Sequence, residues 1–430
     1  MSDRLDLTAT VEAQDAAERL LEAALLGVDH SDANSDALGE LLASETPASV
    51  ANIWVAAATG QAEAVRRFLD ETPELANEPG GTRGWEPLLY LCFSRALGGL
   101  PECREGMHAA ARHLLDAGAD PNVAWFDSAW DNARETPIYG AAGVANDAAL
   151  AAVLLDAGAD PNDGETAYHF VEHEGAPCAD VLWPHLDEKS RGTALLHKLD
   201  YPDLDGLKRL LELGADPNGD SPFGKYALHQ AVFRGHPKRF FDLLFEHGAD
   251  PNKPDRLGRT PYGLAALAGR TEIAGWLVDH GAAANLLPLE AYIAACAMGD
   301  AERARELAQD DPQLAARGPA ERPAQICEVA DGGNVDGTRL MLERGWDVNS
   351  LGPTWSEAAV HRAAMQGHRE VVEVLYEAGA DLRIRDRSYD ASPLGWANHG
   401  GHTAIVEFLA QDLDRLDDRD REALSDHADE

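Results

Sequence analysis

The string Gly-Ala-Asp-Pro-Asn constrains the fold of this 430-residue chain more than any other feature. Intact copies begin at Gly118, Gly158, Gly214 and Gly248, and degenerate copies begin at Gly281, Gly345 and Gly379. Several steps between neighbouring copies are 33 or 34 residues. A repeat of this length predicts a stack of small units, each of which contacts only its neighbours. We therefore do not expect the three globular domains that length alone would indicate.

A second repeated string predicts how each unit begins. It opens with Thr or Ser in most copies and continues into an Ala-rich segment; the copies start at Thr136, Thr166, Tyr226, Thr260 and Ser392. The hydroxyl is suited to cap a helix, and the Pro that often follows is suited to the first helical turn. A Gly then closes a turn to a second helix with apolar residues at helical spacing; these are Gly175, Gly235, Gly269, Gly367 and Gly401. The Gly of the first string is expected to end that helix in a left-handed conformation.

These strings resemble the ankyrin repeat, a β-turn and two helices with a Thr-Pro-Leu-His core. The stretches PLLYLCFSR, GETAYH and ALLHKLDYPDLDG are similar to a bacterial-type subfamily of ankyrin repeat proteins. The resemblance implies an all-α solenoid of about 12 helix-turn-helix repeats joined by β-turn loops, curved so as to present a concave binding face. We expect an N-terminal helical capping repeat at 1–50, the repeat array at 51–410 and an acidic C-terminal tail at 411–430.

Two irregularities interrupt the predicted array. Residues 96–106 are inserted between the two helices of one repeat, and the turn at 123–133 is extended. The extended turn carries Trp125, Phe126 and Trp130. Loops on a rigid scaffold often carry function, so these aromatic side chains are candidates for a binding site. Packing of Trp125 and Trp130 on neighbouring turns is the alternative, and the sequence leaves both open.

The charge of the chain excludes some partners and favours others. With 36 basic and 75 acidic residues the formal net charge is -39, so nucleic acid and anionic membranes are not expected to bind. One segment differs: Lys225 to Arg270 has eight basic and four acidic residues. We hypothesise that an acidic segment of a partner docks near 225–270, on Arg234, Arg256 and Arg259 among others. The alternative is that this segment only offsets the chain's own acidic charge.

The resemblance also implies which positions face a partner. In ankyrin repeats these are the turn tips and the ends of the first helices, and aromatic and Arg residues there are typical of binding hot spots. The candidates are Trp85, Phe93, Trp125, Trp130, His173, Tyr201, Phe223, Lys225, Phe233, Arg234, Arg256, Arg259, Trp355, Met365 and Tyr389. Some of these aromatic residues are equally compatible with stacking on adjacent repeats.

Two stretches imitate metal sites. His169 and His173 are four residues apart and Cys178 follows, which is a spacing that metal ligands use. The resemblance instead makes His169 the motif histidine, which hydrogen-bonds the turn, and places His173 on the groove. The acids Asp203 and Asp205 with Glu212 imitate a calcium loop but fit better as acids at the start of a helix. We therefore expect neither a metal nor a cofactor.

The sequence favours a non-enzymatic protein–protein interaction scaffold, monomeric and cytoplasmic. The G-x-S-x-G, H-E-x-x-H, Walker and G-x-G-x-x-G motifs are absent. No apolar run of about 18 residues occurs, the N-terminus is unlike a signal peptide, and the five cysteines are scattered. Two alternatives remain: an inhibitor or immunity-type partner of another protein, and a metal-dependent enzyme that uses His169 and His173.

Overall fold

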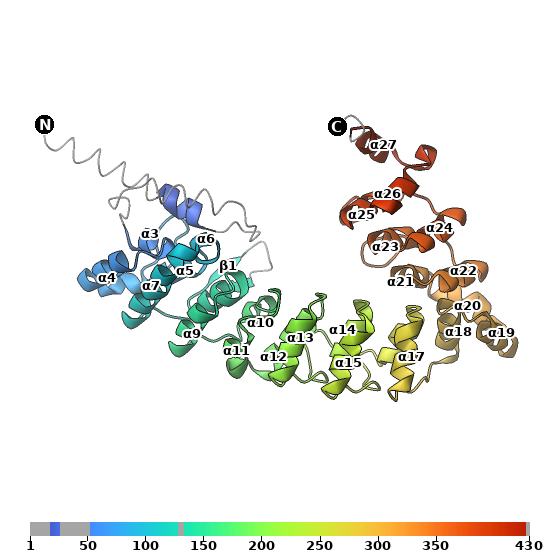
Figure 1. The fold of residues 1–430 in the computed structure, drawn as a ribbon, viewed down its shortest axis with the longest axis horizontal. Helices are drawn as coiled ribbons and strands as arrows, with labels where there is room; N and C mark the ends of the chain where they lie inside the picture. The colour runs from blue at the N-terminus through green and yellow to red at the C-terminus, as the bar shows by residue number, and fades with distance from the viewer. Residues whose placement is uncertain (1–17, 26–51, 128–132, 427–430) are drawn as a thin grey trace. The chain divides into compact units, whose positions relative to one another are not determined.

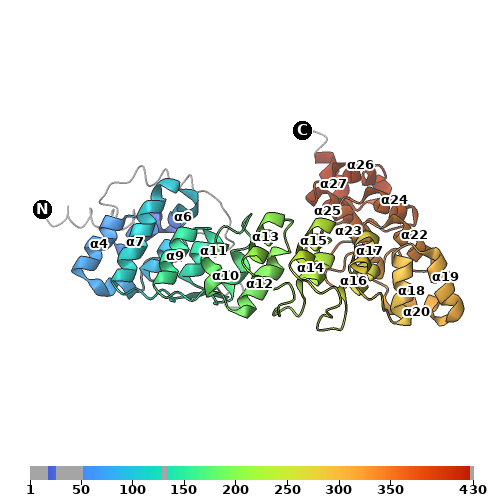
Figure 2. The same ribbon diagram turned by 60° about the horizontal axis from the view of Figure 1, so that its bottom comes forward.

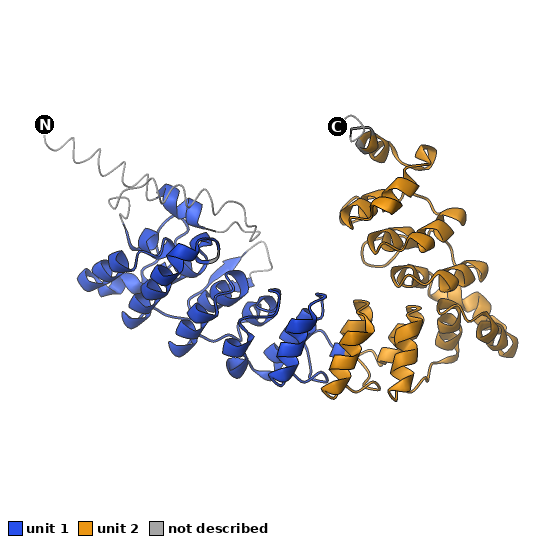
Figure 3. Cartoon of the chain, viewed as in Figure 1, with its two compact units in different colours: residues 1–227 blue, residues 228–430 orange. Residues whose placement is uncertain are grey.

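The computed structural model describes residues 18–25, 52–127 and 133–426, and they are mostly helical. By contacts the chain divides into two compact units, Met1–Ala227 and Leu228–Glu430 (Figure 3). In each unit, short helices follow one another in antiparallel pairs (Figure 1). A mostly helical chain with these repeats fits the predicted all-α repeat fold.

Unit 1 contains a helix at 18–24 and then α3 to α13. The elements are α3 (Ile53–Ala58), α4 (Ala62–Glu71), η2 (Pro73–Asn77), α5 (Pro87–Cys92), α6 (Arg95–Gly99), η3 (Pro101–Cys103), α7 (Arg104–Asp116), β1 (Trp125–Asp127), β2 (Ala133–Glu135), α8 (Pro137–Tyr139), η4 (Gly140–Val144), α9 (Ala148–Asp156), α10 (Glu165–His169), α11 (Ala179–Leu182), η5 (Trp183–His185), α12 (Glu188–Lys198) and α13 (Leu204–Glu212).

Unit 2 begins with α14, whose first residue is the last of unit 1, and continues to α27. The elements are α14 (Ala227–Phe233), α15 (Lys238–Glu246), α16 (Pro261–Leu267), α17 (Thr271–Asp279), α18 (Pro288–Ala297), α19 (Ala301–Asp310), α20 (Gln313–Glu321), α21 (Gln325–Asp331), α22 (Val335–Glu343), α23 (Ala359–Met365), α24 (Arg369–Glu377), α25 (Pro393–His399), α26 (Thr403–Leu409), η6 (Leu413–Arg415) and α27 (Asp418–Asp426).

Each unit has two helical layers because like helices of successive pairs pack together. In unit 1, α3 contacts α5 and α10 contacts α12 in one layer, while α4 contacts α7 and α7 contacts α9 in the other. In unit 2, α23 lies against α21 and α25, and α24 lies against α22 and α26. Small Ala side chains at the contacts of the first helices are fully buried, which lets these helices approach closely.

The helix starts confirm most of the predicted caps. The hydroxyls of Thr136, Thr260 and Ser392 accept a hydrogen bond from the amide three residues on, and each is followed by Pro at the first helical position. At Thr166 the prediction is wrong. Helix α10 begins one residue earlier, with Gly164 at the cap position, and the Thr166 hydroxyl donates instead to Asp163.

The Gly-Ala-Asp-Pro-Asn string ends one pair of helices and connects it to the next. Gly248 has φ +87°, the left-handed conformation that was predicted for this position. The Asp250 carboxylate accepts the amide of Asn252 at 2.8 Å and so forms the turn. The Asn252 side chain then bridges to the next repeat, donating to the Gly281 carbonyl at 2.8 Å and accepting the Ala283 amide at 2.7 Å. The string therefore joins neighbouring repeats as well as forming a turn.

The two predicted irregularities both form regular structure. Helix α6 and the short helix η3 occupy the inserted residues between α5 and α7. Where the sequence predicts an extended turn, β1 and β2 form an antiparallel hairpin in which Trp125 pairs with Glu135. Because side chains alternate across a strand, Trp125 and Asp127 share one face of β1 and Phe126 points to the other. The described part of unit 1 is thus not purely α-helical.

Unit 2 departs from regular stacking at α18, α19 and α20, which cluster together (Figure 1; Figure 2). Helix α18 packs against α16, α19, α20 and α22. Helix α20 is an additional element, and it covers Trp346, whose ring nitrogen donates to the Arg322 carbonyl at 2.9 Å. Helix α21 contacts both α16 and α23, so the next pair of helices continues the stack from α16.

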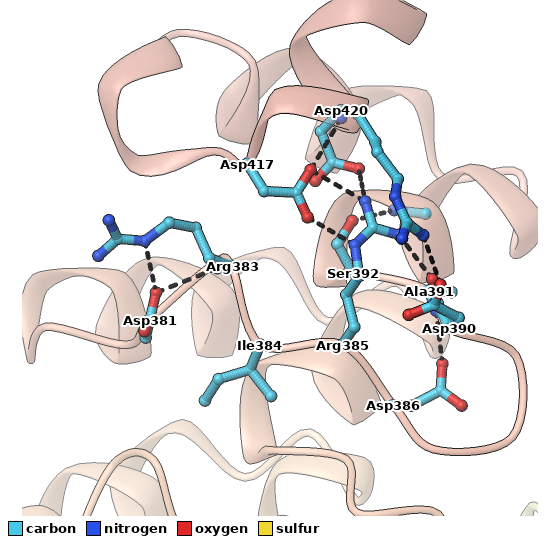
Figure 4. A network of polar contacts seen from close by, with 12 residues as sticks. Asp381, Arg383, Ile384, Arg385, Asp386, Asp390, Ala391, Ser392, Asp417 and Asp420 are labelled. Carbon is cyan, nitrogen blue, oxygen red and sulfur yellow. Dashed lines mark hydrogen bonds and ion pairs between the residues drawn. The ribbon is translucent and has the colours of Figure 1, made fainter.

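Arg385 holds two of the acidic residues that follow the last pair of helices. Arg385 bonds both carboxylate oxygens of Asp417 and reaches Asp420 at 3.1 Å (Figure 4). Asp420 is 7 % exposed, so α27 is seated against the last turn. Within the predicted acidic tail at 411–430, α27 is therefore a helix that packs on the last turn, and residues 427–430 lie outside the described structure.

Candidate partner-binding surfaces

Three turn tips of unit 2 present large apolar side chains to solvent. Leu257 is 75 % exposed, Trp355 is 37 % exposed and Tyr389 is 70 % exposed. Two of these tips are adjacent: the Arg387 amide donates to the Trp355 carbonyl at 2.6 Å, and the Trp355 and Tyr389 ring centroids are 6.4 Å apart. Exposed aromatic residues of this kind are typical of protein-binding hot spots.

A buried carboxylate holds each of these tips in place. Asp386 is 2 % exposed and accepts the amides of Ser388, Tyr389 and Ala391 together with the ring nitrogen of Trp396. Burial by itself would raise the pKa of Asp386, but these hydrogen bonds hold the pKa below its ordinary value.

Asp255 and Glu357 serve the other two tips in the same way. Asp255 accepts the Leu257 amide at 2.9 Å and Glu357 accepts the Trp355 amide at 3.1 Å. A tip that is fixed before binding loses less conformational freedom when a partner docks. No motif in the sequence marks these carboxylates beyond their place in the turn.

Two of the predicted contact residues are buried, which corrects the prediction. Trp85 is 8 % exposed and Phe93 is 2 % exposed, and they pack against each other with ring centroids 5.9 Å apart. Trp125 stacks on Trp85 at 4.9 Å, so the packing alternative holds for this residue of the loop. Trp130 lies outside the described residues. Among the described residues of this hairpin, Phe126 is 62 % exposed.

The other candidates in unit 1 are divided between surface and core. Phe223 is 54 % exposed. His173 and Tyr201 are half-buried and bonded internally, His173 to the Gly143 carbonyl at 2.7 Å and the Tyr201 hydroxyl to Glu172 at 3.1 Å. Lys225 is half-buried. Of these residues, Phe223 is the one that is presented as predicted.

In unit 2, Phe233 is 56 % exposed and Met365 is half-buried. The basic segment is less available than its sequence charge suggests. Arg259 pairs with Asp255 at 2.6 Å, Lys238 pairs with Asp242 at 2.7 Å and Arg270 pairs with Asp331 at 3.1 Å. Arg234 and Arg256 are exposed. At least three of the eight cations thus already have an acidic partner, and acidic docking here stays a hypothesis.

A chain of alternating acids and histidines crosses α10 and α12. His169 lies 3.3 Å from Glu165 and 3.1 Å from Glu172, and His197 lies 2.9 Å from both Glu172 and Asp200. Burial lowers the pKa of His169, but its two carboxylate partners outweigh burial and raise it to about 9. Burial by itself would raise the pKa of Glu172. Its hydrogen bonds to His169 and His197 outweigh burial and lower the pKa.

This network corrects the predicted role of His169. The motif histidines His229 and His361 do bond a turn, to the carbonyls of Arg259 at 2.9 Å and Ile384 at 3.0 Å. His169 and His197 bond acidic side chains instead. The repeat pattern specifies the histidine but not its partner, so it could not predict that these two histidines bond acidic side chains.

The network predicts a pH-dependent stability. A histidine with a raised pKa contributes stability that is complete below about pH 6.5 and is lost as the pH rises through its folded value, about 9 for His169. We expect the network to contribute about 1 to 2 kcal/mol to the fall in the free energy of unfolding between pH 7 and 9. The buried cysteine thiols, whose pKa is also raised, add to this fall, so Glu172→Gln should make the fall smaller by about that amount without abolishing it. Urea unfolding at several pH values measures it.

The control variant must separate the effect of the network from that of Glu135, a nearby carboxyl that also titrates. Burial raises the pKa of Glu135 to about 7. A carboxyl with a raised pKa destabilises as the pH rises from about 4.3 to that value, which lies below the window used. Glu135→Gln is therefore expected to keep the slope between pH 7 and 9. An unchanged slope in Glu172→Gln would contradict the role given to the network.

The arrangement of His169, His173 and Cys178 does not resemble a metal site. His169 points to two glutamates, His173 bonds a backbone carbonyl and the Cys178 thiol bonds Asn146. Within residues 18–25, 52–127 and 133–426, no group of three or more His, Cys, Asp or Glu side chains is placed to hold a metal ion.

The calcium-like stretch is explained by a buried ion pair that the sequence did not reveal. The Asp203 carboxylate caps α13 by accepting the Gly206 amide at 2.9 Å, and Asp205 follows in the first turn. Asp203 also pairs with Lys198, which is fully buried and donates to the carbonyls of Val171 at 2.7 Å and His173 at 3.2 Å. The Asp203 carboxylate therefore pairs with Lys198, a buried structural residue.

Comparison with known proteins agrees with the repeat geometry. A family model described as ankyrin repeats (three copies) matches residues 197–287 and 324–420. These two segments of the chain are similar to ankyrin repeats. No helix in the described part of the chain is both long enough and apolar enough to span a membrane.

Curated relatives share only short segments with this chain. A serine/threonine-protein kinase 12 from Arabidopsis thaliana is 29 % identical over 103 residues, which is 24 % of this chain and 22 % of the kinase. The ARF GTPase-activating protein GIT1 of Homo sapiens is 42 % identical over 78 residues, 18 % of this chain and 10 % of GIT1. The chain thus matches less than a quarter of each relative's length.

Proposed function

We propose that this chain is a non-enzymatic protein–protein interaction scaffold built from about 12 ankyrin repeats. Ankyrin repeats indicate a role in protein binding, and the match at 197–287 and 324–420 lies mostly within the array that we propose at 51–410. We further propose a capping repeat at 1–50 and an acidic tail at 411–430. The observation that carries the proposal is the pair of adjacent tips at Trp355 and Tyr389, exposed and fixed by buried carboxylates. Phe233, Leu257 and Phe223 extend the apolar contact surface.

We propose that the chain works in a reducing compartment, the cytoplasm. We also propose that it is a monomer and that it binds its partner on a concave face of the repeats. Its five cysteines are all free, and burial raises the pKa of the thiols of Cys92, Cys178, Cys296 and Cys327. The net charge of -39 argues against nucleic acid as the partner.

The experiment is to remove both aromatic tips together. Affinity capture from the native cells identifies a partner, which is then purified and titrated against the wild type and Trp355→Ala/Tyr389→Ala. We expect at least a 100-fold weaker Kd, because aromatic hot-spot residues each contribute about 2 kcal/mol or more. Tyr389 is 70 % exposed, but Trp355 is 37 % exposed and packs near Trp396 with ring centroids 5.9 Å apart, so urea unfolding must first show that the variant is folded.

The control is Val278→Ala/Leu413→Ala, which removes exposed apolar side chains that are away from the tips. Its Kd should stay within about twofold of the wild type. If the tip variant is folded and binds with unchanged Kd, the partner does not use this surface and the proposal fails.

A further inference from the structure

Unit 2 contains a cleft of about 690 Å³ that no sequence motif predicts. Three turns line it, each joining the two helices of a pair: Gly235–Arg239, Gly269–Ile273 and Gly332–Asp336. Met298, from the end of α18, completes the lining. In sequence the first and third turns are nearly 100 residues apart, so the cleft is a product of how the pairs are stacked.

The break in stacking at α18 to α20 creates this cleft. Because α21 packs on α16, the turn after α21 lies beside the turn after α16. Asn334 donates to the Gly269 carbonyl at 2.7 Å, and Gln325 donates to the Leu267 carbonyl at 3.0 Å. Arg270 and Asp331 add an ion pair of 3.1 Å. These contacts hold the walls of the cleft together.

A half-satisfied guanidinium lies in the lining of the cleft. The Arg270 side chain is 14 % exposed, and its Nε atom is buried without a hydrogen-bond acceptor. A buried donor that lacks an acceptor costs roughly 1 to 3 kcal/mol, more when charged, and a carboxylate supplied by a ligand would remove that cost. Asp331 satisfies one edge of this guanidinium, which leaves the other for a second acceptor.

Two more cations lie at the rim. Lys238 and Arg239 form the first turn of α15, where the helix dipole favours acids and where α17 and α22 do carry Glu272 and Asp336. Arg239 is exposed, and its guanidinium lies 5.7 Å from the centre of the Phe240 ring. Lys238 forms an ion pair with Asp242 at 2.7 Å.

Glu272 and Asp336 oppose an anionic ligand at the rim, and all four rim charges are exposed and screened alike by solvent and salt. Arg270 is 14 % exposed and is screened less, so the edge of its guanidinium that Asp331 leaves open decides the preference of the interior. Val232, Phe241 and Ile273 give the lining an apolar part as well. The chemistry favours a ligand with a carboxylate and an adjoining apolar group.

We infer that this cleft binds an acidic segment of a protein partner, with an Asp or Glu carboxylate over Arg270 and Arg239 and a neighbouring apolar side chain against Met298. This inference rests on the proposed role in protein binding and names the chemistry of the bound segment. It also replaces the broad hypothesis of acidic docking near 225–270 with one location.

The test uses fluorescence polarisation with a labelled 12-residue peptide that alternates Glu and Leu, and a matched peptide with Lys in place of Glu. Full-length wild type is compared with Lys238→Glu/Arg239→Glu, which should fold because both side chains are exposed and acids suit a first helical turn. The control is Lys208→Glu/Arg339→Glu, which makes the same charge change at exposed positions outside the cleft.

We expect the Glu peptide to bind the wild type, to lose at least tenfold in affinity with the cleft variant, and to stay within twofold with the control. The Lys peptide should bind at least tenfold more weakly to the wild type than the Glu peptide does. Equal losses in the two variants, no binding of the Glu peptide, or equal binding of the Lys peptide would each overturn the inference. A partner that needs Trp355 and Tyr389 would still bind in those cases, so the two proposals fail separately.

Discussion

Replacing Asp203 with alanine is expected to lower the free energy of unfolding of unit 1 by about 3 to 5 kcal/mol. Lys198 is fully buried, and Asp203 is its charged partner. Removing the carboxylate leaves a buried ammonium with only the carbonyls of Val171 and His173. The same change removes the cap of α13 and the acceptor of the Gly175 amide, which adds to the loss.

Urea unfolding followed by circular dichroism measures this effect. The matched variant is Lys198→Met, which removes the buried charge while it fills a similar volume. It leaves the carbonyls of Val171 and His173 without their donor, so we expect it to cost about 1 to 3 kcal/mol on its own. Combined with Asp203→Ala, it should recover most of the stability lost by Asp203→Ala alone. A double variant as unstable as Asp203→Ala would show that the cap, and not the ion pair, carries the effect.

Replacing Trp346 with alanine is expected to destabilise unit 2 by about 3 to 5 kcal/mol. Trp346 is 2 % exposed, and it fills the space between α20 and α18, beside Gly318 and with its ring 6.5 Å from that of Tyr292. Alanine would leave a cavity and would deprive the Arg322 carbonyl of its donor. The loss should be local, so α20 should become sensitive to limited proteolysis.

Trp346→Phe separates the two contributions. It keeps most of the ring volume but removes the ring nitrogen, so we expect it to lose about 1 to 2 kcal/mol. If Trp346→Ala unfolds at the urea concentration of the wild type, α20 does not depend on this side chain and the account of the break in stacking is wrong.

The helix pairs were predictable from the sequence because each of their signals is local. A capping hydroxyl, a Pro and a left-handed Gly act within one turn of the chain, and Thr260, Pro261 and Gly248 behave as expected. Thr166 fails because a competing acceptor, Asp163, lies three residues before it. The extra helix α20 was missed because it replaces a turn without any repeat motif.

The candidate sites were less predictable because they depend on contacts between repeats. The sequence does not distinguish an exposed aromatic residue at a turn tip, such as Tyr389, from a buried one, such as Trp85. The difference arises from the hairpin, which places Trp125 against Trp85. The cleft at Arg270 requires knowing that α21 packs on α16, and no periodic pattern encodes that contact.

The central claim is that a partner binds on the turn tips of unit 2, and hydrogen–deuterium exchange on the purified complex tests it most directly. The account predicts slower amide exchange on binding at 255–259, 352–358 and 386–391, the turns that carry Leu257, Trp355 and Tyr389. It predicts little change in α17, α22 and α24, the second helices of their pairs. Protection confined to those second helices, with unchanged exchange at the tips, would contradict it.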